Sequence, residues 1–191
     1  LPVQRAMAAG LPGRIFRPAL ISPTLSGQGA NADISIRLLA FMLKVGFGTT
    51  ASNQVSFIPV DQVARNIVAI SNWDEGLGQT FHVTRDEYAS LGDVTDWFST
   101  FSGKPIELLD LDDFVDAVLL RCTPEDPLFP LLNFFVRSTK KIKAMSFKRY
   151  DNTGYQVARA AVGCPADSTL EEVVRGIYQF MIHLNMVDGV R

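Results

Sequence analysis

Near the start of the chain, a short and mostly apolar run predicts a strand. Ile15, Phe16, Leu20 and Ile21 lie within seven positions. Such a run is typical of a parallel strand that is covered on both faces. Pro18 interrupts the run, and because proline has no amide hydrogen for a sheet ladder, we expect a sheet end or a bulge there.

Farther along, apolar residues recur every three or four positions, which is the period of a helix with one buried face. Asp61 is a suitable N-cap for one of these helices, and Ser168 with Glu171 has the spacing of a capping box for the last. Pro130 suits the first turn of another helix. The helices expected from this pattern cover residues 3–9, 34–45, 61–71, 92–101, 112–120 (beginning at Asp112 or Asp113) and 168–184.

Two polar segments separate these elements. Residues 22–32 are rich in Ser, Gly, Pro and Asn, and we expect a mobile loop with little to bury. Residues 138–151 are polar and basic, which predicts a surface excursion. With one further strand at 80–84, the pattern predicts a predominantly helical α/β fold with only a few short strands.

Composition narrows the class of protein. The 191 residues are 47% apolar, and 18 basic residues oppose 20 acidic ones, so we expect one compact domain without the basic stripe that nucleic acid needs. No apolar run approaches the roughly 20 residues that span a bilayer, and the first residues do not resemble a signal peptide. We therefore expect a cytoplasmic protein with neither nucleic acid nor membrane as a partner.

Candidate chemistry is sparse. Cys122 and Cys164 have no Cys-x-x-Cys spacing, so buried thiols are the expected interpretation and no metal site is predicted. His82 reads as a satisfied core residue on its short strand. The chain has neither a glycine-rich nucleotide loop nor a Tyr-x-x-x-Lys pair; Tyr155 precedes Arg159 at that spacing, and we interpret Tyr155 as structural. No catalytic residue is predicted.

Several segments resemble a known family in their order along the chain. These are Arg14-Ile-Phe-Arg-Pro-Ala-Leu-Ile21, Phe57-Ile-Pro-Val-Asp-Gln-Val-Ala-Arg65, Thr80-Phe-His-Val83, Pro127-Leu-Phe-Pro-Leu-Leu132 and the last helix. They resemble the carboxy-terminal part of the thioester reductase domains of nonribosomal peptide synthetases, polyketide synthases and aminoadipate reductases. These domains are extended short-chain dehydrogenases with a Rossmann-like fold.

The resemblance implies that residues 1–191 form a single carboxy-terminal, substrate-binding portion, and that the amino-terminal NADP-binding Rossmann half is absent. The implied activity is NADPH-dependent reductive release of a carrier-bound acyl or peptidyl thioester as an aldehyde or alcohol. The catalytic Ser/Thr, Tyr and Lys of the family have no counterpart here, so this portion alone is expected to be inactive and to bind NADPH only with the missing half.

The implied partners are that Rossmann half and a carrier protein with its phosphopantetheine arm, and exposed strand edges could also lead to self-association. The segment implied to pass beside the nicotinamide is Pro18, Ala19, Leu20 and Ile21. The residues implied to border the substrate are Ser22, Thr24, Ser26, Gly27, Phe114 and Phe129. Arg17 and Asp61 are expected to pair and brace the site.

For each of these groups of predicted site residues, a purely structural interpretation stays open. The segment at Pro18 could be a buried strand end, residues 22–31 an ordinary solvated loop, and the phenylalanines plain core. Two other functions also remain: a stand-alone, non-catalytic module that binds a carrier protein, and part of an extended short-chain epimerase or dehydrogenase.

Overall fold

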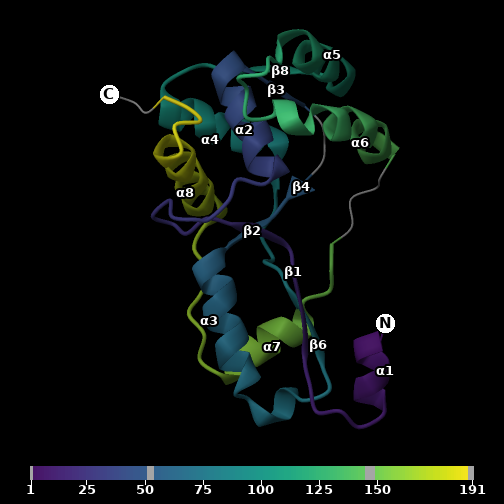
Figure 1. The fold of residues 1–191 in the computed structure, drawn as a ribbon. Coiled ribbons are helices and arrows are strands. Elements are labelled where there is room, and N and C mark those ends of the chain that lie inside the picture. The colour runs from purple at the N-terminus through teal and green to yellow at the C-terminus, as the bar shows by residue number, and fades with distance from the viewer. Residues whose placement is uncertain (1, 51–53, 145–148, 189–191) are drawn as a thin grey trace.

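The computed structural model describes residues 2–50, 54–144 and 149–188, and these form two lobes (Figure 1). The large lobe consists of α2 (Ile34–Val45), α4 (Leu91–Ser102), α5 (Leu111–Arg121), α6 (Leu132–Ala144), α8 (Leu170–His183), β3 (Phe47–Thr49) and β8 (Glu107–Leu109). The small lobe consists of β1 (Ile15–Pro18), β6 (Thr80–Val83), α3 (Val60–Ser71) and α7 (Thr153–Ala161). The remaining elements are α1 (Pro2–Ala8), β2 (Leu20–Ser22), β4 (Gln54–Val55), β5 (Phe57–Pro59), β7 (Ala89–Ser90) and the 3-10 turns η1 (Asp74–Gly76) and η2 (Phe129–Leu131).

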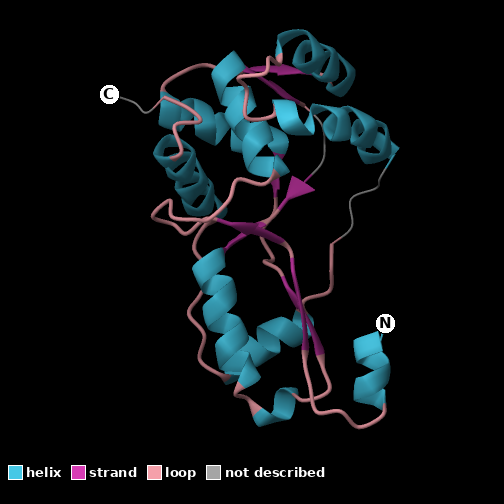
Figure 2. Ribbon diagram, viewed as in Figure 1, coloured by secondary structure: helices cyan, strands magenta, loops and turns pink. Residues whose placement is uncertain are grey.

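The strands pair two by two in the described part of the chain. β1 pairs in parallel with β6, β2 with β5 and β3 with β8, whereas β4 and β7 are antiparallel. Figure 2 shows strands running from the region between the lobes into the small lobe, while helices make up most of the large lobe. This arrangement confirms the predicted class, a mainly helical α/β fold with a few short strands.

β5 joins the two hydrophobic cores. Successive side chains of a strand point to opposite faces. Accordingly, Phe57 packs into the core of the large lobe, and its neighbour Ile58 packs into the core of the small lobe. Two residues of one strand therefore belong to separate cores.

Local periodicity located the main helices. α2 runs from Ile34 to Val45 as expected; Asp33 caps its start, and Gly46, in the left-handed region at φ 78°, ends it. α4 and α8 also lie where the apolar stripes predicted them. Within the described residues, no helix is both long and apolar enough to cross a bilayer.

Helix starts were predicted less well. Asp61 does not cap α3, because the helix already begins at Val60, after Pro59, and Asp61 lies in its first turn. α5 is capped by Asp110, whose side chain accepts from the amides of Asp112 and Asp113, so the predicted start was too late. The capping box of α8 is Thr169 with Glu172, one residue beyond the predicted pair.

The segment 138–151 was also interpreted incorrectly in part. α6 continues to Ala144, so residues 138–144 are helical rather than an excursion, and 145–148 lie outside the described residues. Residues 153–161, for which no element was predicted, form α7 against α3 and β6. This helix supplies the small lobe with Tyr155 and Ala158, which are both buried.

Candidate functional site

The chain changes strand partner at the predicted proline. β1 follows β6 as far as the pair Pro18 and Val83, and the amide of Ala19 then donates to the Val83 carbonyl at 3.1 Å. From Leu20 onward, the chain pairs with β5 instead. The expected sheet end at Pro18 is therefore confirmed. Ligands of open α/β sheets bind where parallel strands reach their carboxyl ends and their neighbours diverge.

A cleft of about 620 Å³ lies at this change of partner, within the size range of ligand sites. Its wall mixes polar and apolar side chains, and we call it the polar cleft to distinguish it from the pocket described below. Arg17, Pro18, Ala19 and Leu20 form one wall. The polar residues Gln54, Ser56, His82, Thr84 and Tyr88 also line the cleft, and His82 lies beside Arg17 on the neighbouring strand. Three of the four residues predicted to lie beside a nicotinamide thus line one cleft. The fourth, Ile21, lines a separate cavity of about 130 Å³ together with Ser22.

The predicted strand is less covered than expected. Leu20 and Ile21 are 38% and 41% exposed, so this stretch is not buried on both faces. On β1, Phe16 stacks on Phe81 with ring centroids 5.5 Å apart, whereas Arg17 and Pro18 are exposed. The physical reason is that both faces of the segment are open here: Leu20 borders the cleft, whereas Ile21, which follows it and points to the other face, borders the smaller cavity.

His82 belongs to the cleft rather than to the core, contrary to the sequence prediction. Its Nδ1 lies 3.2 Å from the carbonyl oxygen of Asp151, and its ring meets that of Tyr150 edge to face at 5.3 Å. Nearby, the hydroxyl of Thr84 is buried and has no hydrogen-bond partner among the described residues. A buried hydroxyl beside a cleft is a suitable group for binding a ligand polar atom.

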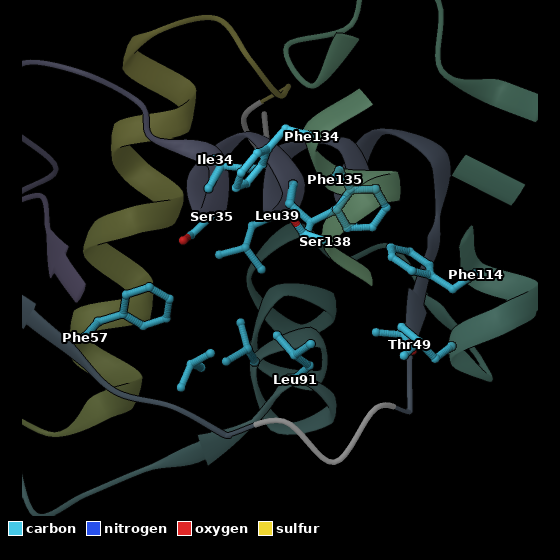
Figure 3. Close-up of a pocket in the computed structure, with 14 residues that line it drawn as sticks. Ile34, Ser35, Leu39, Thr49, Phe57, Leu91, Phe114, Phe134, Phe135 and Ser138 are labelled. Carbon is cyan, nitrogen blue, oxygen red and sulfur yellow. The ribbon is translucent and has the colours of Figure 1, made fainter. Parts of the chain in front are cut away.

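A second, apolar pocket of about 240 Å³ opens in the large lobe (Figure 3). Its wall combines side chains from β5, α2, α4, α5 and α6, including Phe57, Leu39, Leu91, Phe114 and Phe135. The hydroxyl-bearing residues Ser35, Thr49 and Ser138 also line it. Among the described residues of this wall, none carries a charge.

The two cavities adjoin. Val55 of β4 lines both the polar cleft and the apolar pocket. In addition, Leu20 at the cleft is paired in register with Phe57 at the pocket, because β2 and β5 are neighbours. Val55 is thus the residue at which the two cavities meet.

The loop residues predicted to border a substrate pack against α8 instead of lining either large cavity. Thr24 and Ser26 face each other at 3.0 Å, and Thr24 also accepts from the amide of Gln28. Gly27 has φ 73°, and a Cβ there would lie 2.7 Å from the Cβ of Gln179. This glycine therefore permits close packing on α8. Its carbonyl oxygen lies 2.9 Å from His183 Nδ1.

The two phenylalanines that were predicted to border the substrate do not lie in the same place. Phe114 is 1% exposed and lines the apolar pocket, whereas Phe129 is 41% exposed on η2 and lies outside it. The sequence prediction did not include Phe57 or Leu91. Phe57 lay within the quoted family segment, but nothing in that segment alone shows that its side chain faces a pocket.

Arg17 and Asp61 are not paired among the described ion pairs. Asp61 pairs with Arg65, one helical turn on, at 3.2 Å, and Arg17 lines the cleft. Tyr155 is structural as predicted, because it is 1% exposed and its hydroxyl accepts from Asn66 at 2.7 Å. Burial raises the pKa of this hydroxyl above its ordinary value, and the Asn66 hydrogen bond opposes the shift.

The cysteines and the acidic residues offer no evident reactive centre. Cys122 and Cys164 are free and only half-buried, which corrects the expectation of buried thiols, and partial burial raises the pKa of each. No group of three or more His, Cys, Asp or Glu side chains in the described ranges could hold a metal ion.

Comparison with known proteins places this arrangement in context. An NAD-binding family model described as "Male sterility protein" matches residues 2–67, which include both of the first two family-like segments. The search of curated proteins found no match to this chain. The fold is similar to the terminal R domain from the myxalamid PKS-NRPS biosynthetic pathway, with 19% identity and a TM-score of 0.87 over 99% of this chain and 48% of that one.

Two other solved structures are also similar to this chain in fold. A thiolation-reductase di-domain from an archaeal non-ribosomal peptide synthetase is 20% identical, with a TM-score of 0.67 over 95% of this chain and 38% of that one. UDP-glucuronic acid 4-epimerase from Bacillus cereus, in complex with UDP-glucuronic acid and NAD, is 16% identical. Its TM-score is 0.54 over 89% of this chain and 45% of that one.

The chain therefore spans half or less of the length of these structures. Its fold is similar to about half or less of each of these reductase and epimerase structures. The predicted resemblance to terminal reductase domains is confirmed.

Proposed function

We propose that this chain is the substrate-binding portion of an NADPH-dependent thioester reductase, which releases a carrier-bound acyl or peptidyl chain as an aldehyde or alcohol. The observation that carries the proposal is the junction at Val55 between a polar cleft and an uncharged apolar pocket. A reacting carbonyl needs the polar side, and the chain attached to it needs the apolar side. The fold likeness to the myxalamid terminal R domain supports the same assignment.

The polar cleft fits the nicotinamide end of a dinucleotide. Its volume is sufficient, Thr84 offers a buried hydroxyl without a partner in the described structure, and Arg17 supplies a cation at the rim. The amide of Ala19 is already used by Val83, so a carboxamide would bond to other groups of this wall. Bound there, the cofactor would supply the hydride.

The residues of this chain would orient the substrate rather than transfer protons. The apolar wall would exclude water from the thioester carbonyl, which strengthens electrostatic interactions in the site. The proton donor and the dinucleotide's phosphate site are proposed to lie in an amino-terminal Rossmann half, since no glycine-rich loop occurs here. This portion by itself is accordingly expected to be inactive.

Helix α1 and the free edge of β1 suit the docking of that half. α1 has no buried residue in the described structure, and Val3 and Leu11 are 54% and 56% exposed. β1 pairs with β6 along one edge, and among the described strands none pairs with the other edge. A strand of the Rossmann half would satisfy that edge; without it, association of two copies would be the competing outcome.

The test is reduction by the longer natural polypeptide that contains this chain. We expect it to oxidise NADPH when given an acyl thioester on a carrier protein or on pantetheine, while residues 1–191 alone show no turnover. Arg17→Ala should weaken NADPH binding, whereas Arg175→Ala, on the exposed side of α8, serves as the matched control.

Two outcomes would overturn the proposal. Turnover of a nucleotide sugar instead of a thioester would identify the protein as an epimerase-type relative. If residues 1–191 proved to be the entire natural protein and bound a carrier protein without chemistry, the interaction-module hypothesis would replace it.

A further inference from the structure

The apolar pocket has two recognisable ends. Phe57 and Phe114 lie on opposite sides of it in Figure 3. Phe57 is the register partner of Leu20, which lines the polar cleft. The Phe57 end therefore lies nearer the proposed reaction centre, and the Phe114 end, on the opposite side, is the far or deep end of the pocket for a molecule that enters from the cleft.

The deep end is a fixed wall. Phe114 is 1% exposed, and its ring packs edge to face on Phe47 at 5.9 Å and on Phe135 at 6.2 Å. Aromatic pairs in this geometry hold each other in place. Unlike Phe114, Phe134 is 60% exposed although it lines the same pocket, so it lies at the opening.

The residues that line the apolar pocket disfavour a charged ligand. The described lining residues are apolar apart from hydroxyl-bearing Ser35, Thr49 and Ser138. A carboxylate or ammonium moved into such a pocket would lose its hydration and find no opposite charge there. A neutral hydrocarbon chain would instead gain from leaving water.

We infer, on the basis of the proposed function, that the substrate is a neutral apolar acyl chain whose carbonyl lies at the Phe57 end and whose tip reaches Phe114. Phe114 then sets the longest chain that fits. This inference makes it a specificity-determining residue.

Binding can be measured separately from reduction. Amide analogues of acyl-pantetheine, which cannot be reduced as thioesters, are titrated into the full-length protein by calorimetry. We expect the octanoyl analogue to bind at least about tenfold more tightly than the counterpart that ends in a carboxylate, because burying the charge is costly. Equal affinities would overturn the assignment of substrate class.

The length limit is tested by Phe114→Leu. The variant should bind longer chains, with a gain of about fourfold for each additional methylene that enters the pocket. Phe98→Leu is the matched control, because Phe98 is 0% exposed in the same core but does not line the pocket. The inference fails if both variants shift the preferred length equally or if neither does.

A second variant tests the inference in case Phe114→Leu does not fold. Leu111 also lines the pocket and lies three residues before Phe114 on the same helix face. Leu111→Phe should fill the deep end and favour shorter chains; an unchanged preference would count against the inference. Reduction of thioesters without chain-length preference would reject only this inference, whereas a clear preference without reduction would reject only the proposed function.

Discussion

The two lobes are stabilised in different ways. The large lobe has an extended apolar core in which Phe41, Phe98 and Ile177 are completely buried. The small lobe buries fewer apolar side chains and combines them with polar ones: Asn66 is 0% exposed and Arg159 is 6% exposed. Apolar burial is nondirectional, whereas buried polar groups require specific partners. The small lobe therefore depends more on individual contacts.

Asn66 bonds to Tyr155, and Asp167 is the partner of Arg159. Asp167 lies between α7 and α8, accepts from Gln62 of α3, and pairs with Arg159 of α7 at 2.9 Å. Arg159 also donates to the Pro165 carbonyl at 2.6 Å. These polar contacts thus hold the segment between α7 and α8, which leads to the large lobe, against α3 and α7 of the small lobe.

The largest effect is expected from the core of the large lobe. Phe41→Ala should lower the free energy of unfolding by about 3–5 kcal/mol, because the removed ring leaves a cavity. Urea denaturation measures this loss, and hydrogen exchange should accelerate in α4 and α8 before α3 and α7. Leu120→Ala, at an 85% exposed position, should change stability by less than about 0.5 kcal/mol. Equal losses for the two variants would contradict the contrast between a closed core and the surface.

An intermediate effect is expected at the ion pair between Asp167 and Arg159. Asp167→Ala should cost about 3 kcal/mol, since it leaves the mostly buried Arg159 guanidinium without its carboxylate partner. Asp61→Ala is the control, because its pair with Arg65 is exposed and should contribute less than about 1 kcal/mol. Similar results for both variants in the same denaturation experiment would show that the buried pair is not what stabilises this lobe.

The smallest effect concerns a single hydroxyl. Tyr155→Phe should cost about 1–2 kcal/mol near neutral pH, because Asn66 would lose its partner in a buried position. Tyr150→Phe, at a 63% exposed ring, is the control and should be nearly neutral.

The comparison of wild type with Tyr155→Phe also gives a test that depends on pH. Burial raises the pKa of Tyr155 in the folded protein, so above about pH 10 the unfolded chain releases this proton more readily than the folded one. The stability contributed by the neutral hydroxyl is therefore complete below about pH 10 and is lost as the pH rises. The difference between wild type and Tyr155→Phe should narrow in that range, and a difference that stays constant would refute the assigned cause.

Local patterns identified most of the helices because each of these carries its own apolar period, but they missed α7 and the end of α6. They were less reliable at helix starts, and α8 shows why. Ser168 and Glu171 have the same spacing as Thr169 and Glu172, so the sequence offers two capping boxes. The complete burial of Leu170 fits a helix that starts after Thr169, and this packing is a tertiary effect. Strands of two or three residues, such as β4 and β7, are too short to show a period.

The sequence by itself determined the parallel strand around Arg17, its interruption at Pro18, the main helices and the resemblance to terminal reductase domains. Each of these depends on neighbouring residues and on backbone chemistry that proline alters locally. Only the tertiary structure decided that His82 borders a cleft, that Gly27 packs on α8, and that Phe57 and Phe114 form opposite ends of one pocket. A pocket wall is assembled from separate elements, and no local period records which of their side chains meet.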